Sequence, residues 1–221
     1  MKRIVLALAT TVAAIALAPS ASATICIGVA VNGGAITNVG CDGGTGSVNY
    51  NTTTGGYFYN VGATGNPLLA MGTLLTQSIN IQSQGGSNAL IDVYVTQQGI
   101  TSPTTGLLST LTSNTVSGLT ATLTSYYSAA NALWGGTQLQ NVVFAGPGVG
   151  GGGNAIAVAG PWSETVKYSL NFTGGNGSNF NGTANLTAVP EPATWGLMLL
   201  GFGAMGGMLR TRNRKVRVRF A

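Results

Sequence analysis

The feature that most constrains the fold of this chain is a strict alternation of apolar and polar residues in short segments. From Thr165 to Thr173 every second residue is apolar, and Asn179–Thr187 repeats the alternation. A period of two places successive side chains on opposite faces of a β-strand, so both segments are predicted strands. The intervening residues 174–178, Gly-Gly-Asn-Gly-Ser, are typical of a turn. We therefore predict that the two strands form a β-hairpin with a five-residue loop.

Further segments alternate in the same way or are rich in strand-forming residues. They are Cys26–Val31, Ser47–Tyr50, Tyr57–Val61, Leu74–Ile81, Ile91–Val95, Leu119–Leu123, Gln138–Phe144 and Ala155–Val158. About ten short strands separated by glycine and asparagine turns predict an all-β fold, a sandwich or a jelly roll. The predicted domain covers residues 24–188, a length that can bury a core.

Two segments of this domain are predicted to depart from the strand pattern. Ser125–Trp134, with the sequence SYYSAANALW, is expected to hold one short helix. Gly146–Asn154 reads GPGVGGGGN and is expected to be a flexible loop, because glycine weakens strands. A phosphate-binding loop is a poorer interpretation of these glycines, since no Lys-Ser/Thr pair follows them.

The distribution of charge argues against a nucleic-acid partner. The formal net charge is +5, but the basic residues gather at the two ends of the chain. Between Thr24 and Val189 the charged residues are Asp42, Asp92, Glu164 and Lys167, a net charge of −2 from three acids and one lysine. Without a basic face the domain cannot neutralise a phosphate backbone, so no nucleic acid is expected to bind.

The N-terminus has the pattern of a secretory signal peptide over residues 1–23. Lys2 and Arg3 precede an apolar run over residues 4–18, which is too short for an ordinary membrane-spanning helix. Ala21-Ser22-Ala23 is a small-residue cleavage site. We predict that the mature chain begins at Thr24 and is exported through the inner membrane to the periplasm.

Export gives a meaning to the two cysteines, Cys26 and Cys41. In an oxidising compartment they are expected to form one disulfide. Closing a loop of about 15 residues contributes roughly 3 kcal/mol to stability by chain entropy. A metal or redox pair is a weaker interpretation, because the spacing is not C-x-x-C and the chain contains no histidine.

Catalytic residues are scarce, so we expect no enzyme, no metal and no cofactor. Asp42, Asp92 and Glu164 are far apart in the sequence, and neither G-x-S-x-G nor S-x-x-K occurs. A hydrolase remains a distant alternative. It requires Asp92 and Glu164 to meet in a cleft within about 5–10 Å, as the two carboxylates of a glycosidase do.

Aromatic residues leave a second function open, that of a carbohydrate-binding, lectin-like module. Aromatic side chains can stack on sugar rings while their polar tips form hydrogen bonds. The candidates are Tyr50, Tyr57, Phe58, Tyr59, Tyr126, Tyr127, Trp134 and Trp162. The alternation favours the core for most of them, whereas aromatics exposed together on one sheet face would favour the module.

The C-terminus combines three elements that together suggest membrane insertion. Residues 193–209 form an apolar run that spans about 25 Å as a helix, at the short end for a membrane span. The basic residues after this run, in the segment 210–221, are typical of a cytoplasmic stop-transfer tail. Pro190 and Pro192 keep the chain before the helix extended. One transmembrane helix is therefore predicted, with the β-domain outside.

In this order the three elements of residues 189–215 resemble the PEP-CTERM sorting signal of Gram-negative bacteria in its P-E-P-x-x-W form. The same tail also carries the label of an ice-binding protein C-terminal domain. The residues that carry the resemblance are Pro190, Glu191, Pro192 and Trp195, followed by the basic residues Arg210, Arg212, Arg214 and Lys215. The resemblance implies processing by exosortase and transfer from the inner membrane to the cell surface or extracellular matrix. It also implies association with exopolysaccharide, flocs or biofilm. We accordingly expect an exported, non-enzymatic surface or matrix protein.

Overall fold

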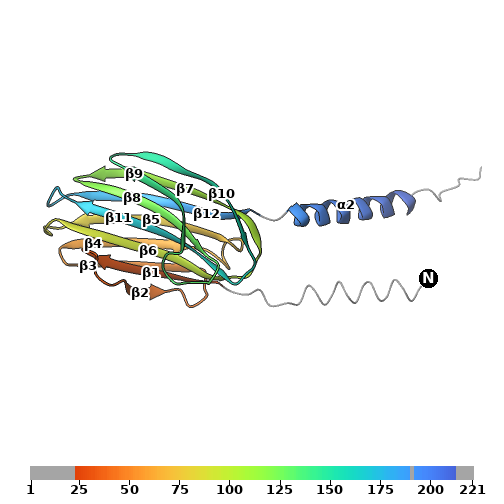
Figure 1. The fold of residues 1–221 in the computed structure, drawn as a ribbon, viewed down its shortest axis with the longest axis horizontal. Helices are drawn as coiled ribbons and strands as arrows, with labels where there is room; N and C mark the ends of the chain where they lie inside the picture. The colour runs from red at the N-terminus through yellow and green to blue at the C-terminus, as the bar shows by residue number, and fades with distance from the viewer. Residues whose placement is uncertain (1–22, 190–191, 213–221) are drawn as a thin grey trace, which may run out of the picture.

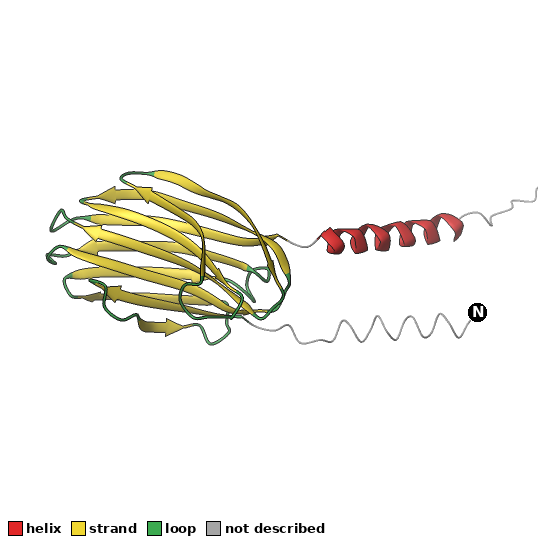
Figure 2. Ribbon diagram, viewed as in Figure 1, coloured by secondary structure: helices red, strands yellow, loops and turns green. Residues whose placement is uncertain are grey.

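Two antiparallel β-sheets of six strands each make up the body of the protein (Figure 1). The structure is a computed structural model that describes residues 23–189 and 192–212, and within the C-terminal helix it describes the side chains of residues 196–208. In sheet A the strands follow the order β2 (Thr37–Cys41), β1 (Thr24–Val31), β6 (Ala89–Ile100), β11 (Trp162–Phe172), β8 (Leu119–Ser128) and β9 (Thr137–Phe144). In sheet B the order is β10 (Gly148–Val158), β7 (Thr104–Ser117), β12 (Asn179–Val189), β5 (Thr73–Ser83), β4 (Tyr57–Thr64) and β3 (Ser47–Thr54). The prediction of an all-β sandwich is confirmed, and Figure 2 shows that the body consists of strands joined by loops.

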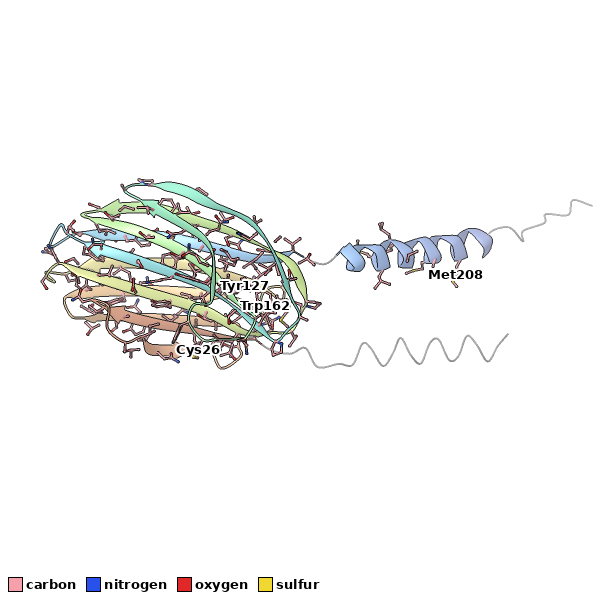
Figure 3. All side chains as sticks on the ribbon, viewed as in Figure 1. Cys26, Tyr127, Trp162 and Met208 are labelled. Atoms are coloured by element: carbon pink, nitrogen blue, oxygen red, sulfur yellow. A yellow bond between two sulfur atoms is a disulfide. The ribbon has the colours of Figure 1, made fainter. Side chains whose placement is uncertain are left out.

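The core lies between the sheets and is built from the inward positions of the alternating segments. Trp162, which Figure 3 labels, and Tyr168 are fully buried, and the ring of Tyr168 meets that of Phe180 edge-on at 5.9 Å across the two sheets. Two hydrogen bonds also join the sheets, between the hydroxyls of Thr76 and Tyr168 and between those of Ser109 and Ser125. Because these buried hydroxyls satisfy one another, they also favour one alignment of the sheets.

Every segment predicted as a strand coincides with a strand, although Thr173 at the end of one segment follows the end of β11. Two strands were missed. β2 is short, and β7, the longest strand, is rich in threonine and serine. Inward positions of β7 alternate between leucine and serine, as in Leu111 and the buried Ser109 and Ser113. Serines at core positions hide the apolar alternation from which a strand is recognised.

The predicted hairpin is wrong, because its two strands belong to different sheets. β11 pairs with β6 and β8 in sheet A, whereas β12 pairs with β5 and β7 in sheet B. The loop between them crosses the end of the sandwich and is held there by Gly118, whose carbonyl accepts hydrogen bonds from the backbone N–H groups of Thr173 and Gly174. The period-two pattern specifies the inward face of a strand but not its partner.

The predicted helix at Ser125–Trp134 is also wrong. Its first four residues complete β8, where Tyr126 and Tyr127 pair with β11 and β9. The remainder is a loop in which Asn131 and Trp134 adopt positive φ angles of 54° and 66°. Tyrosine favours a pleated, half-buried position over a helix, and positive φ angles end any regular element.

The glycine-rich segment Gly146–Asn154 is not a loop, because strand β10 begins at Gly148 and pairs with β7. The glycines make room for the neighbouring strand β9. A Cβ atom on Gly150 would lie 2.7 Å from Cγ1 of Val142, and one on Gly148 would lie 3.3 Å from Cε1 of Phe144. Glycine is therefore required here by the close approach of another strand.

The C-terminal segment forms helix α2 over Pro192–Arg212. In the part of the chain that the structure describes, no helix combines the length and the apolar character that crossing a membrane requires. The transmembrane span predicted over residues 193–209 is thus not supported, and glycines at 201, 203, 206 and 207 dilute the apolar side chains of this helix. The signal peptide, apart from Ala23, lies outside the described residues, as do residues 190–191 and 213–221.

Candidate functional site

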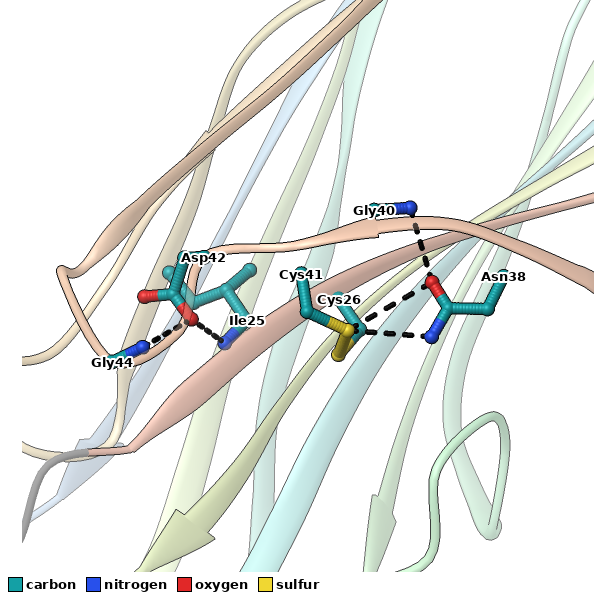
Figure 4. Close-up of a disulfide and its surroundings, with 7 residues drawn as sticks. All are labelled: Ile25, Cys26, Asn38, Gly40, Cys41, Asp42 and Gly44. Carbon is teal, nitrogen blue, oxygen red and sulfur yellow. Dashed lines mark hydrogen bonds between the residues drawn. A yellow bond between two sulfur atoms is a disulfide. The ribbon is translucent and has the colours of Figure 1, made fainter.

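The predicted disulfide between Cys26 and Cys41 is confirmed (Figure 4). The two cysteines lie directly opposite each other on β1 and β2, with Cα atoms 4.1 Å apart. The bond therefore ties the short edge strand β2 to the sheet. Its role is structural, since a bonded cysteine can neither bind a metal as a thiolate nor act as a nucleophile.

Asp42, the residue after this disulfide, holds a turn together. Its Oδ1 accepts hydrogen bonds from the backbone N–H groups of Ile25 at 2.9 Å and Gly44 at 3.0 Å. Its Oδ2 accepts another from Gly46 at 2.6 Å. An aspartate that satisfies three backbone donors is committed to stabilising the loop.

Glu164 is fully buried in the core between the sheets. Its Oε1 accepts a hydrogen bond from Nε2 of Gln97 at 3.3 Å, while its Oε2 has no hydrogen-bond partner among the described residues. Burial raises the pKa of this carboxyl well above its ordinary value. Burial disfavours the ionised form, because ionisation would place a charge in the interior of the protein.

The structure does not bring Asp92 and Glu164 together. Asp92 lies opposite Ser169 in the pairing of β6 with β11, whereas Glu164 lies opposite Gln97, five residues away along the strand. Asp92 also points away from the core, since its neighbours Ile91 and Val93 are fully buried. The carboxylate pair of a glycosidase is thus not formed. Over residues 23–189 and 192–212 there is likewise no group of three metal-ligating side chains.

Asp92 instead belongs to a cluster on the outer face of sheet A. Its Oδ2 lies 3.0 Å from Nζ of Lys167, and its Oδ1 accepts a hydrogen bond from the hydroxyl of Ser169. The Lys167 ammonium lies 5.3 Å from the ring centroid of Tyr94, which in turn lies 6.1 Å from that of Trp134. We call these five residues the Tyr94 cluster.

The Tyr94 cluster is electrically balanced and partly covered. Partial burial alone lowers the pKa of Lys167, but the hydrogen bond and the charge of Asp92 outweigh it, and the net shift is upward. Trp134 comes from the loop after β8 and lies against β1, where a Cβ on Gly28 would be 2.9 Å from its Cη2. The cluster thus has aromatic and polar groups but no free charge. The Trp134 ring of the cluster packs against the outer face of sheet A.

The remaining aromatic candidates do not form an exposed platform. Tyr57, Tyr59 and Trp162 are buried, and Tyr50 and Tyr127 pack against the core. Phe58 and Tyr126 are half-buried and belong to opposite sheets. Tyr94 was missed as a candidate. Its alternation with the inward Val93 and Val95 could have placed it on the outer face, but its neighbours there depend on strand pairing.

The sandwich and the C-terminal segment are joined with almost no linker. The hydroxyl of Thr104 donates to the carbonyl of Val189 at 2.8 Å, so β12 is held to its last residue, and α2 begins at Pro192. Comparison with protein families matches residues 188–215 to the family described as PEP-CTERM protein-sorting motif. The C-terminal segment is a PEP-CTERM motif. The resemblance noted in the sequence is confirmed.

The PEP-CTERM motif implies an exported protein that exosortase recognises, with a membrane-anchored precursor that is sorted to the cell surface. Its residues Pro192, Trp195, Arg210 and Arg212 lie in α2, while Pro190, Glu191, Arg214 and Lys215 lie outside the described residues. At the other end, Ala21 lies outside them as well. Ala23 is fully buried, and Thr24 begins β1.

Comparisons of the chain with curated proteins and with solved structures give weaker similarities or none. No curated protein matches the sequence. Among solved structures, TmCBM61 in complex with β-1,4-galactotriose matches with a TM-score of 0.33 and 10% identity, over 57% of this chain and 87% of that one. An isomalto-dextranase of Arthrobacter globiformis T6 complexed with panose matches with a TM-score of 0.28 and 16% identity, over 64% of this chain and 23% of that one. Scores this low do not establish a shared fold.

Proposed function

We propose that this chain is a non-enzymatic protein of the cell surface or extracellular matrix, which exosortase releases through its PEP-CTERM motif. The observation that carries the proposal is the position of the motif. It begins at residue 188, one residue before the end of β12, and the fully buried residues of the hydrophobic core lie between Ala23 and Leu186. A cut near Pro190 therefore releases the whole sandwich with its core intact.

The burial of Ala23 bears on when the signal peptide is removed. Its backbone N–H donates to Oδ1 of Asn66 at 3.2 Å inside the folded domain. A peptidase that cuts between Ala23 and Thr24 needs an extended, accessible chain. Signal-peptide removal therefore precedes folding in the periplasm, and the disulfide between Cys26 and Cys41 forms in the same compartment.

The absence of catalysis in this proposal is supported by what the carboxylates of the sandwich do. Asp42 caps a turn, Asp92 pairs with Lys167, and Glu164 is enclosed in the core. Asp42 and Asp92 stabilise local structure, and Asp92 and Glu164 are not placed beside each other as a general acid and base must be. In this proposal the sandwich is displayed outside the cell, and the C-terminal segment is the sorting signal.

The proposal is tested by following the tail of the protein in its own host. The variant Glu191→Ala removes the carboxylate between the two prolines and leaves α2 and the arginines unchanged. We expect it to accumulate in the inner membrane with its basic tail attached, as the wild type does in a host that lacks exosortase. The matched control Asn185→Ala changes an exposed residue of β12 and should be released normally.

Mass spectrometry of the released wild type should find Thr24 at its N-terminus and no residue beyond the region of Pro190. Release of Glu191→Ala at the wild-type rate would refute processing by exosortase and leave simple anchoring as the role of the tail. A mature chain that keeps residues 4–18 would refute the signal peptide.

A carbohydrate-binding module remains the second candidate function for the sandwich. The specific observation in its favour is the Tyr94 cluster, where an aromatic ring lies beside paired polar groups on an outer sheet face. If the cluster binds carbohydrate, substitution of Tyr94 by alanine should abolish retention of the protein on polysaccharide. The same assay can then be applied to the site inferred below.

A further inference from the structure

A row of asparagines crosses the outer face of sheet B. Asn51 of β3 lies directly opposite Asn60 of β4, Asn60 opposite Asn80 of β5, and Asn80 opposite Asn181 of β12. On the next strand, β7, Asn114 donates from Nδ2 to Oδ1 of Asn181 at 3.0 Å. These five residues, which we call the asparagine row, come from five adjacent strands.

The asparagine row faces away from the core. In β4 the neighbours of Asn60 are Val61 and Tyr59, both buried, and in β5 Asn80 lies between the buried Ile79 and Ile81. Asn51 and Asn114 are exposed, and the three central asparagines are half-buried. Adjacent strands are about 4.8 Å apart, so the row presents carboxamides at a regular spacing across the sheet.

A second row of polar residues runs beside the first. Its members lie opposite one another in the order Thr53, Phe58, Gln82, Asn179 and Ser117. Phe58 is the aromatic member, half-buried on the outer face beside the carboxamides. The two rows together form a polar surface with one apolar ring in it.

Sheet B carries no charge, since none of its six strands contains an aspartate, glutamate, lysine or arginine. All the charged residues of the sandwich belong to sheet A or to the loop at Asp42. A charged polymer or lipid headgroup would lose hydration on this surface without gaining a counter-charge. An uncharged partner is therefore favoured.

The carboxamides restrict the partner further. Each asparagine offers two N–H donors and one carbonyl acceptor, and sugar hydroxyls are likewise both donors and acceptors. Phe58 adds a ring on which the apolar face of a sugar can lie. A regular row that spans five strands suits a long, extended chain better than a compact ligand.

We propose that the outer face of sheet B binds an uncharged, extended polysaccharide along the asparagine row. This inference rests on the proposed function, because it requires the sandwich to be displayed outside the cell. It names the ligand class and places the site on the opposite sheet from the Tyr94 cluster.

A purely structural role for the row would require its carboxamides to bond to one another, as they do in stacked β-sheets. Among the described residues, only Asn114 and Asn181 form such a bond within the row. Oδ1 of Asn80 is shielded from water and has no hydrogen-bond partner among those residues. The row is therefore not arranged to satisfy itself, as a stabilising ladder would be.

The test uses the sandwich as a purified domain of residues 24–189, which contains all but Ala23 of the core. The probe is the exopolysaccharide of the producing bacterium, separated by anion exchange into a neutral and an acidic fraction. Binding is measured by affinity electrophoresis in gels that contain either fraction. The variant is the double substitution Asn60→Asp with Asn181→Asp, which keeps the shape of both side chains and replaces donors with charge.

We expect the wild type to be retarded by the neutral fraction and the variant to bind it at least tenfold more weakly. The matched control Asn141→Asp, at an exposed position of β9 in sheet A, should bind as the wild type does. Thermal unfolding of all three proteins establishes that they are folded.

Equal binding of the double variant, or no binding of the wild type to the neutral fraction, would overturn the inference. Preference of the wild type for the acidic fraction would also overturn it. So would a result in which Tyr94→Ala loses binding while the double variant keeps it. Each of these results leaves release by exosortase untouched, because that is measured separately through Glu191→Ala.

Discussion

Replacing Glu164 with glutamine should remove a dependence of stability on pH that the wild type owes to one buried carboxyl. Glu164 is fully buried and accepts a hydrogen bond only from Gln97 among the described residues. Burial raises the pKa of its carboxyl in the folded protein, while in the unfolded chain the same group titrates near 4.5. Glutamine has nearly the same shape and keeps a carbonyl acceptor, but it cannot ionise.

The magnitude follows from proton linkage. Because the folded-state pKa is raised, the stabilising effect is fully present below the unfolded value and is lost as the pH rises toward the folded one. In that interval the unfolded chain holds one proton fewer than the folded chain. Between those two pKa values the free energy of unfolding should therefore fall by about 1.4 kcal/mol for each pH unit. The chain has no histidine, so no imidazole titrates in this range.

Urea unfolding of the 24–189 domain at pH 5, 6 and 7, followed by tryptophan fluorescence, measures this slope. Glu164→Gln should show a nearly flat profile and should exceed the wild type in stability at pH 7. The control Asp92→Asn removes a carboxylate from the outer face instead and should keep the wild-type slope. If the wild type and Glu164→Gln have the same slope, Glu164 is not held neutral by the core, and the reasoning is refuted.

Two further predictions concern the framework of the sandwich. Replacing both Cys26 and Cys41 with alanine should lower the free energy of unfolding by roughly 3 kcal/mol in urea titrations, because the unfolded chain gains the freedom of an open loop. An unchanged stability would mean that the bond does not restrict the unfolded state. Gly150→Ala should cost about 1–3 kcal/mol by thermal unfolding, since its Cβ would meet Val142 at 2.7 Å. Combining it with Val142→Ala should cost less than the sum of the two single changes, and a full sum would contradict the proposed contact.

The positions of most strands could be predicted because the alternation that marks them is local. Val166, Tyr168 and Leu170 alternate with polar residues within one strand, and this suffices to identify its inward face. Pairing is not local. The turn after Phe172 was taken for a hairpin although it joins two sheets, because glycine-rich turns serve both kinds of connection. Gly150 appeared to break a strand because its neighbour Val142 could not be foreseen.

The candidate sites also differ in whether they depend on local sequence or on strand pairing. The disulfide of Cys26 and Cys41 could be predicted from export and from the number of cysteines alone. The Tyr94 cluster and the asparagine row could not, since each depends on which strands are neighbours and in what register. Asn51 and Asn181 are far apart in the sequence, and only the pairing of four strands places them in one row.

The position of the asparagine row relative to the tail bears on how the two proposals fit together. Strand β12 runs from Asn179 to Val189, and Asn181 lies eight residues before its end. The PEP-CTERM motif begins at residue 188, so at about 3.3 Å per residue the row is roughly 23 Å from its start. β1 also begins at the end of the sandwich where β12 finishes (Figure 1). The row therefore lies toward the end of the sandwich opposite the PEP-CTERM motif. Its distance from the start of the motif exceeds the Debye length of about 8 Å over which surface charges act. Polysaccharide can thus reach it while the precursor is still anchored. Variants of the asparagine row should leave processing of the PEP-CTERM motif unchanged, and variants of Glu191 should leave binding of polysaccharide unchanged. A single substitution that abolished both processing and binding would contradict this separation.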